Sequence, residues 1–185
     1  MKTLVIHPLD QSTGFLFEIY RDKGYTVVND LETCRSRKKI TELIKAHGRV
    51  MCLGHGGPTG LFYTCINPEL VYLLKKKEIV FIWCHADKFV ERYGLVGFYT
   101  RMFISEVAEA AYYGIKTTQD KIDYSNNLFA SEFRKYESML NVHNLIKEAY
   151  IGECPVIQFN NERLCERNEE SILNYKDLKD ELLLN

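Results

Sequence analysis

The sequence predicts a three-layer α/β sandwich with a mainly parallel sheet, on three observations. Short β-prone runs alternate with segments of helical spacing, an order that favours parallel strands joined by crossover helices. Two of these runs, residues 50–53 and 79–83, are apolar throughout, as strands buried on both faces are. At 185 residues the chain is long enough to bury a full core, and we expect one domain over residues 1–185.

The first half of the chain follows this alternation. Candidate strands end at turn residues and lie at residues 4–6, 25–28, 50–53 and 79–83. Candidate helices have apolar residues three and four apart and lie at residues 12–23, 36–47 and 67–74. Ser36 and Asn67 can cap the last two, and Pro68 suits a first helical position. Residues 61–66 are too short for a helix and predict a small hairpin or extended arm.

The second half is less regular and predicts a small C-terminal α+β extension. Gly94 and Gly97 indicate a loop over the sheet edge, and Ser105 can cap the helix that follows. Further expectations are a strand at 115–118, helices at 126–139 and 142–151, a hairpin over 156–164 and a charged helix near 171–184.

Composition narrows the classes of partner. The formal net charge of −1 gives no electrostatic case for nucleic acid or an anionic membrane. No apolar run approaches the roughly 20 residues of a membrane span, and the N-terminal run is too short for a secretion signal. Six scattered cysteines without a CxxC pair are typical of reduced thiols, so a cytoplasmic location is expected.

Two of the predicted strands stop at chemically active residues, His55 and Cys84. Because ligands sit outside the carboxyl ends of parallel strands, neighbouring strands would bring this imidazole and this thiol to one edge. A cysteine nucleophile requires such a base. Glycines flank His55, and the N–H groups of Gly56 and Cys84 are candidate oxyanion donors for acyl transfer. His7 ends the first strand at the same edge and is a candidate pocket residue, and His85 is an alternative imidazole partner.

The order of these features resembles the caspase-like fold of clan CD cysteine peptidases, which include caspases, metacaspases, gingipains and legumain. The resemblance covers about residues 3–115: Phe15–Tyr20 and Lys23-Gly-Tyr-Thr-Val27 resemble the entry to the second strand, and Gly60-Leu-Phe-Tyr63 resembles the hairpin after the catalytic His-Gly. It implies a flavodoxin-like strand topology. It also implies that His55 is the catalytic histidine, Gly56 the oxyanion residue and Cys84 the nucleophile.

The sequence departs from the caspase pattern around the nucleophile. The run Ile-Trp-Cys-His-Ala has the large Trp83 where caspases have a small residue, and no basic pocket for an Asp substrate is identified. Asp87 and Glu91 lie where gingipain-like relatives would contact a basic substrate side chain. Surface acids are the simpler explanation of both.

The sequence therefore predicts a cysteine endopeptidase acting on peptide or protein substrates, with no metal or organic cofactor. One alternative is an inactive caspase-like binding or scaffold domain. Another is a flavodoxin-like nucleotide- or metal-binding enzyme. In that case the glycine-rich turn 54–60 would cradle a phosphate, or Cys52, His55, Cys84 and His85 would bind zinc. The turn fits neither GxGxxG nor the P-loop pattern, and Cys52 differs in strand parity from His55. Nothing in the sequence indicates an oligomeric state.

Overall fold

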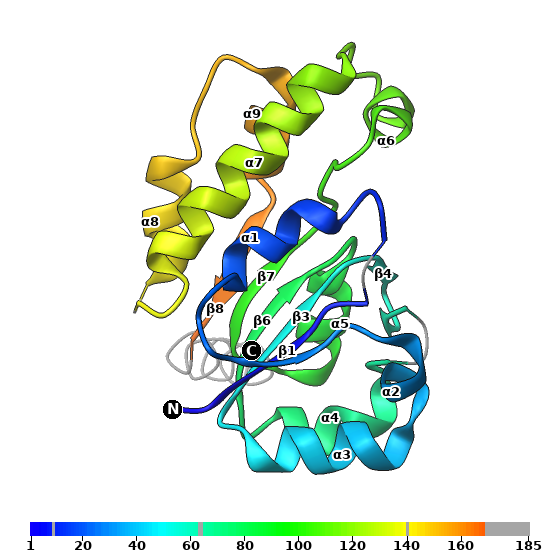
Figure 1. The fold of residues 1–185 in the computed structure, drawn as a ribbon. Coiled ribbons are helices and arrows are strands. Elements are labelled where there is room, and N and C mark those ends of the chain that lie inside the picture. The colour runs from blue at the N-terminus through cyan, green and yellow to red at the C-terminus, as the bar shows by residue number, and fades with distance from the viewer. Residues whose placement is uncertain (9, 63–64, 140, 169–185) are drawn as a thin grey trace, which may run out of the picture.

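The protein is built on a six-stranded sheet enclosed by two helical layers (Figure 1). The computed structural model describes residues 1–8, 10–62, 65–139 and 141–168. The sheet has the order β2-β1-β3-β6-β7-β8. Its strands are β1 (Thr3–Ile6), β2 (Thr26–Val28), β3 (Arg49–Leu53), β6 (Glu78–Ile82), β7 (Gly97–Thr100) and β8 (Leu164–Arg167). Among these six described strands, β8 alone runs antiparallel to its neighbour. The predicted α/β sandwich with a mainly parallel sheet is confirmed. When the strands of this sheet are counted in chain order, β6 is the fourth and β7 the fifth, so the parallel part has the 2-1-3-4-5 order of one doubly wound class.

The helices divide into two layers (Figure 1). One face of the sheet carries α2 (Leu31–Arg35), α3 (Arg37–Ala46), α4 (Val71–Leu74) and α5 (Ala86–Tyr93), with a 3₁₀ turn at Pro68–Leu70 before α4. The other face carries α1 (Phe17–Tyr20), α7 (Gln119–Tyr136) and α8 (Val142–Ala149), with a 3₁₀ turn at Gly14–Leu16 before α1. Two further helices, α6 (Val107–Tyr112) and α9 (Pro155–Asn161), pack against α7 through a small third apolar cluster.

Strand alternation builds the two main cores. In β3, Val50 and Cys52 face the layer of α2 to α5, whereas Met51 and Leu53 face the layer of α1, α7 and α8. All four side chains are fully buried. A central parallel strand of this kind has no polar face, which is why residues 50–53 are continuously apolar.

The predicted caps of two helices are confirmed. The Ser36 hydroxyl accepts from the Lys39 N–H at 3.5 Å, and the Asn67 side chain accepts from the Glu69 N–H at 3.1 Å. Pro68 occupies the first helical turn, as expected. Local polar chemistry therefore fixes where these helices begin.

The loop expected beyond Cys84, through Gly94 and Gly97, is wrong, because α5 and β7 lie there. Gly94 ends α5 in the left-handed conformation, with φ of 62°, and so acts as a helix stop. Gly97 has φ of 141°, and a Cβ there would lie 2.1 Å from the Ile79 carbonyl oxygen. This glycine permits the close approach of β7 to β6, where the sequence suggested only a turn.

Three C-terminal expectations are also wrong. Residues 115–118 lie in the connection between α6 and α7, because β7 and β8 complete the sheet. The expected hairpin is instead α9 followed by β8, and Pro155 occupies the first turn of that helix. Helix α6 is capped by Glu106 in a capping box with Glu109, and Ser105 donates to Glu109. The helix expected near 171–184 lies outside the described residues.

A buried ion network closes the amino end of the sheet. Glu137, which follows α7, pairs with Arg49 of β3 and accepts a 2.6 Å hydrogen bond from the Tyr25 hydroxyl. Lys23 lies 3.2 Å from the same carboxylate. Burial alone would raise the pKa of Glu137, but the hydrogen bond from Tyr25 and the charge of Arg49 outweigh it and lower that pKa.

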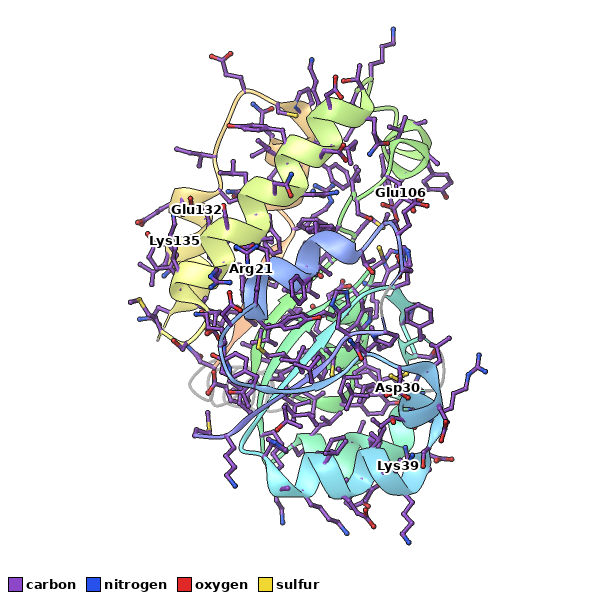
Figure 2. The ribbon with its side chains drawn as sticks, in the orientation of Figure 1. Arg21, Asp30, Lys39, Glu106, Glu132 and Lys135 are labelled. Atoms are coloured by element: carbon purple, nitrogen blue, oxygen red, sulfur yellow. The ribbon has the colours of Figure 1, made fainter. Side chains whose placement is uncertain are left out.

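Charges of both signs are spread over the surface of the helices (Figure 2). Lys39 of α3 pairs with Glu32 of α2 at 3.4 Å, and Lys135 pairs with Glu132 at 2.6 Å on α7. Among the residues that the structure describes, no helix combines the length and apolar character that crossing a bilayer requires.

Candidate active site

His55 and Cys84 follow neighbouring strands at the same edge of the sheet. Strands β3 and β6 pair in parallel, with Leu53 opposite Ile82. His55 and Cys84 each lie two residues beyond this pair, and the Gly54 N–H donates to the Ile82 carbonyl at 3.0 Å. Since adjacent strands lie about 4.8 Å apart, this register brings the imidazole and the thiol into one region. The two side chains share no hydrogen bond among the described residues.

The turn that carries His55 is held by Trp83. Beyond His55 the chain forms a two-stranded hairpin of β4 (Gly56–Gly57) and β5 (Gly60–Leu61). The Trp83 indole N–H donates to the Gly57 carbonyl at 3.1 Å. A Cβ at Gly56 would lie 2.5 Å from the Trp83 ring, so only glycine fits there. The large residue before Cys84 therefore supports the His55 turn, and its side chain is buried on the α5 side of the sheet.

Hairpin geometry directs the Gly56 N–H outward. The Phe62 N–H donates to the His55 carbonyl at 3.0 Å, which makes these two residues a hydrogen-bonded pair. Antiparallel ladders alternate, so the next pair, Gly56 with Leu61, points its N–H groups away from the partner strand. The Leu61 N–H does so, donating to the Ile66 carbonyl at 3.1 Å. The Gly56 N–H is thus not consumed by the hairpin.

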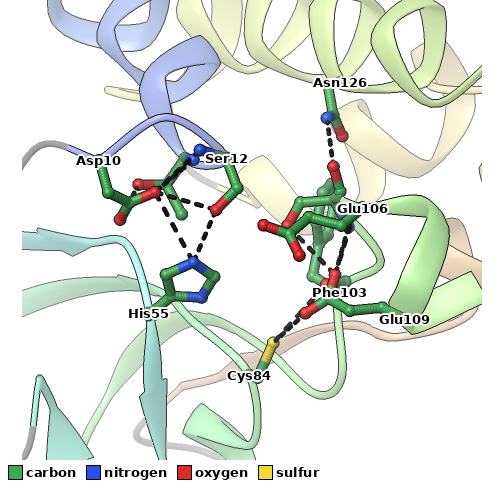
Figure 3. A network of polar contacts seen from close by, with 10 residues as sticks. Asp10, Ser12, His55, Cys84, Phe103, Glu106, Glu109 and Asn126 are labelled. Atoms are coloured by element: carbon green, nitrogen blue, oxygen red, sulfur yellow. Dashed lines mark hydrogen bonds and ion pairs between the residues drawn. The ribbon is translucent and has the colours of Figure 1, made fainter. Parts of the chain in front are cut away.

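A loop between β1 and the first 3₁₀ turn orients the His55 ring. The His55 Nε2 atom lies 2.7 Å from the Ser12 hydroxyl oxygen and 3.6 Å from Asp10 Oδ1 (Figure 3). Ser12 has one hydroxyl proton, and it donates this proton to Asp10 Oδ1 at 2.9 Å. The serine must then accept from His55, which assigns the ring proton of the neutral imidazole to Nε2 and leaves Nδ1 as the acceptor nitrogen of that tautomer. In Figure 3 this second ring nitrogen lies on the side of the ring nearer Cys84.

Asp10 is itself held as a carboxylate. Its oxygens accept from the backbone N–H groups of Ser12 and Thr13, each at 2.9 Å, and from the Thr13 hydroxyl at 2.8 Å. Burial alone would raise the pKa of Asp10, but these hydrogen bonds and the nearby imidazole lower it overall. The loop therefore presents a fixed negative charge behind His55.

Cys84 faces the loop that follows β7. Its thiol donates to the Phe103 carbonyl at 3.6 Å, and Glu109 Oε1 lies 3.8 Å from the same sulfur (Figure 3). Burial and the Glu109 carboxylate together raise the pKa of Cys84 to about 12. Cys84 is a protonated thiol in this conformation, and a proton acceptor is needed before it can attack.

A cavity of about 550 Å³ lies between the two loops. Ser12, whose hydroxyl contacts His55, lines one side. The opposite side is lined by the loop and helix segments that follow Cys84: Ser105, Glu106, Val107, Ala108, Gln119 and Asp123. The cavity adjoins the candidate site through Ser12, which contacts His55, and through Ser105, which donates to the Glu109 carboxylate near Cys84. Its lining includes neither His55 nor Cys84.

The other predicted site residues lie farther from solvent or have structural partners. His7 is fully buried, its Nδ1 lies 3.0 Å from the Tyr20 hydroxyl, and burial lowers its pKa to about 4. Asp87 is buried in the first turn of α5, with the Lys88 ammonium 3.8 Å away. His85 is half-buried and holds the left-handed conformation, with φ of 65°, that turns the chain from Cys84 into α5. The structure thus gathers His55, Gly56 and Cys84, with His85 adjacent in the chain.

The geometry gives little support to the alternatives of a zinc site or a phosphate-binding turn. Within the described part of the chain, no group of three or more His, Cys, Asp or Glu side chains could hold a metal ion. Cys52 is buried in the sheet, and its pKa is raised well above the ordinary value by burial. In the turn 54–60, Gly56 packs against Trp83 and Gly60 against the Ile66 carbonyl, so these glycines serve internal packing.

Sequence reasoning missed three residues of the site: Asp10, Ser12 and Glu109. A signal for the first two was present, since Asp10-Gln-Ser-Thr13 follows a strand at the active edge and is a typical side-chain-capped turn. Glu109 was hidden because its spacing from Glu106 is that of a helix cap, the role it also fills.

Comparisons of the chain with known proteins indicate no family. No protein-family model matches the chain, and no curated protein matches it closely enough to indicate a relative. The class that the fold and site define is therefore a three-layer α/β domain with a histidine and a cysteine at the carboxyl edge of its parallel sheet.

Proposed function

We propose that this protein is a caspase-like cysteine peptidase that cleaves peptide or protein substrates with His55 and Cys84. The observation that carries the proposal is the Asp10–Ser12–His55 chain of hydrogen bonds, which leaves His55 Nδ1 as the basic nitrogen. A strand-edge thiol with a base oriented by a third group is the usual arrangement for nucleophilic catalysis.

The reaction follows from these positions. The Cys84 thiol gives its proton to His55 Nδ1 as Sγ attacks the scissile carbonyl carbon, and the Gly56 N–H donates to the developing oxyanion. Collapse breaks the C–N bond, and His55 returns the proton to the departing amine. Water, deprotonated by the same imidazole, then hydrolyses the thioester and regenerates the thiol. Asp10 and Ser12 act as positioning residues that hold the ring and stabilise the imidazolium.

Covalent labelling tests the dyad directly. We would expose the full chain to short peptides ending in a chloromethyl ketone and map the adducts by mass spectrometry. The expected adduct is on Cys84, lost in Cys84→Ala and formed at least about tenfold more slowly in His55→Gln. Cys165→Ala is the matched control, because this half-buried thiol lies outside the site.

Equal labelling of Cys84 in wild type and His55→Gln would refute the dyad. Asp10→Asn and Ser12→Ala should each slow labelling while leaving binding of the unreactive parent peptide unchanged. A structural defect would weaken both.

A second function, a peptide-binding module without turnover, is favoured by one specific observation. Glu109 and burial hold Cys84 as a thiol with a pKa near 12, which opposes nucleophilic attack. This function predicts that the unreactive peptides bind in the cavity between the loops while their chloromethyl ketones leave Cys84 unmodified.

A further inference from the structure

The cavity between the two loops carries negative charge on its walls. Its volume of about 550 Å³ lies within the range of small-molecule sites. Glu106 contributes a carboxylate from the N-cap of α6, and Asp123 contributes another from α7. Among the described residues that line the cavity there is no lysine, arginine or histidine. The walls therefore supply no counter-charge of their own.

The two carboxylates are hydrogen-bonded but not paired with a cation. The Glu106 side chain accepts from the Glu109 N–H in the capping box, and Asp123 Oδ1 accepts from the Gln119 amide at 2.7 Å. Both of these donors are neutral. In the part of the chain that the structure describes, Glu106, Glu109 and Asp123 take part in no ion pair. Carboxylates that share one partly enclosed space repel each other, and a cation bound between them removes this cost.

A buried acceptor lies behind the same wall. Gln119, Asp123 and Asn126 are spaced four and three residues apart, so they lie on one face of α7. Asn126 is 5% exposed, and its side chain points from α7 towards the Ser105–Glu106 loop (Figure 3). Its Nδ2 atom donates to the Ser105 carbonyl at 3.1 Å, whereas its Oδ1 atom has no partner among the described residues. A buried carbonyl oxygen without a donor is costly, so this position favours a ligand that brings N–H groups.

These acceptors select the chemistry of the ligand. A guanidinium carries a full positive charge and five N–H donors in one plane, and it has no acceptor. It can therefore face the carboxylates of Glu106 and Asp123 and the free oxygen of Asn126 with donors alone. An ammonium concentrates its three donors on a single nitrogen, so it can reach fewer of these acceptors at once.

The charge of the cavity acts on the candidate nucleophile. Ser105, on the lining, donates to the Glu109 carboxylate, which contacts Cys84. Besides burial, the charges of Glu109 and Glu106 both raise the pKa of Cys84. A group bound beside Glu106 therefore lies within the electrostatic reach of the thiol.

We propose that the cavity is a specificity subsite that binds the arginine side chain of a peptide substrate through Glu106 and Asp123. The proposal rests on the proposed function for the identity of the ligand as a peptide, but the binding itself requires no turnover. The acids of this subsite come from α6 and α7. The sequence instead suggested Asp87 and Glu91 for a basic substrate, and these belong to α5 on the other face of the sheet.

Binding of a blocked arginine tests the subsite on the full chain. The probe is N-acetyl-arginine methylamide, and its matched control is the citrulline compound, which has nearly the same shape and no charge. Isothermal titration calorimetry should give a dissociation constant at least about tenfold lower for the arginine compound, because charge-assisted hydrogen bonds are about twice as strong as neutral ones. Glu106→Gln and Asp123→Asn together should remove this preference. Asp120→Asn, which removes an exposed acid of the same helix outside the lining, should keep it.

Three outcomes would overturn the subsite: equal affinity for the two compounds, no binding of either, or an arginine preference that survives in the double variant. The comparison of the two compounds uses the wild-type chain, so it stands even where a variant folds poorly. Peptide chloromethyl ketones separate this result from the proposed dyad. Labelling of Cys84 without any preference for arginine would refute the subsite alone. Binding of the arginine compound without labelling by an arginine chloromethyl ketone would refute the peptidase and leave the subsite as a binding site.

Discussion

At the scale of single residues, the chemistry of the site depends on the ring proton of His55 and the thiol proton of Cys84, and on the groups that contact each. His55 is oriented from behind by Ser12 and Asp10, whereas Cys84 is held in its protonated form by burial and by Glu109. The two members of the candidate dyad therefore differ. The His55 ring is oriented to act as a base, whereas the raised pKa of Cys84 restrains the nucleophile in its protonated form. The proposed catalysis would require relief of this restraint on Cys84.

Glu109→Gln should release part of this restraint. Removing the carboxylate charge lowers the pKa of Cys84, while burial keeps it above that of an ordinary thiol. Glutamine also suits the third position of a capping box, so α6 is retained. We expect the pH profile of Cys84 alkylation by iodoacetamide to move to lower pH and the rate at pH 8 to rise. An unchanged profile would show that Glu109 does not act on the thiol.

Buried His7 should make the protein less stable in mild acid. Its pKa falls from 6.5 to about 4 on folding, so the unfolded chain binds the proton more readily. The associated stability, up to about 3 kcal/mol, is complete above pH 6.5 and is lost as the pH falls towards 4. Urea denaturation at several pH values should show this slope in wild type and not in His7→Phe. Identical slopes in the two proteins would exclude His7 as its source.

At the scale of elements, the glycine-rich hairpin is a fitted part of the site. Trp83 both precedes Cys84 and supports the turn that carries His55, so the two strand ends are coupled through one indole. The Trp83 side chain packs in the α5 layer, whereas the Cys84 side chain contacts the loop that follows β7. This coupling gives a physical reason for a large residue at a position where the caspase pattern has a small one.

Gly56→Ala and Gly57→Ala form a matched pair that tests this fit. A Cβ at Gly56 would lie 2.5 Å from Trp83 and 2.8 Å from the Gly60 carbonyl oxygen, whereas at Gly57 nothing lies within 4 Å. We expect Gly56→Ala to lower the free energy of unfolding by about 1–3 kcal/mol and to slow labelling of Cys84. Gly57→Ala should change neither by much. Denaturation followed by circular dichroism measures the stability, and equal effects of both substitutions would contradict a specific role for Gly56.

At the scale of the whole molecule, the carboxyl edge of the sheet carries the candidate site, and the amino edge carries a stabilising ion network. The carboxyl edge carries the candidate site and its cavity, between loops from the two halves of the chain. The amino edge carries the buried network of Arg49 and Glu137, which ties the end of α7 to the central strand β3. The helix that forms one wall of the cavity is therefore anchored at the opposite end of the domain.

Glu137→Gln should destabilise the whole domain. Removing the buried partner leaves Arg49 with only the half-exposed Glu78, 3.0 Å from its Nε atom, as a counter-charge. Breaking a buried ion pair in this way costs about 3–5 kcal/mol. The matched control is Glu32→Gln, whose exposed pair with Lys39 should contribute less than about 1 kcal/mol. Because the pKa of Glu137 is lowered on folding, its contribution is complete at neutral pH and is lost as the pH falls below the ordinary carboxyl range. Equal urea midpoints for Glu137→Gln and wild type would contradict this role.

The sequence by itself determined the layered α/β architecture, several of its strands and caps, and the placement of His55 and Cys84 beyond adjacent strands. These features follow from local signals: continuous apolar runs, capping residues, and the rule that parallel strands end at one edge. It misassigned α5, β7 and α9, because Gly94 and Gly97 resemble turn residues and residues 156–159 are equally β-prone.

Only the tertiary structure decided what surrounds the two residues. Ser12 reaches His55 across 43 positions of sequence, Asp10 lies in the same loop, and Glu109 reaches Cys84 across 25 positions. A pKa and a hydrogen-bond partner depend on burial and neighbours in space, which no local pattern encodes.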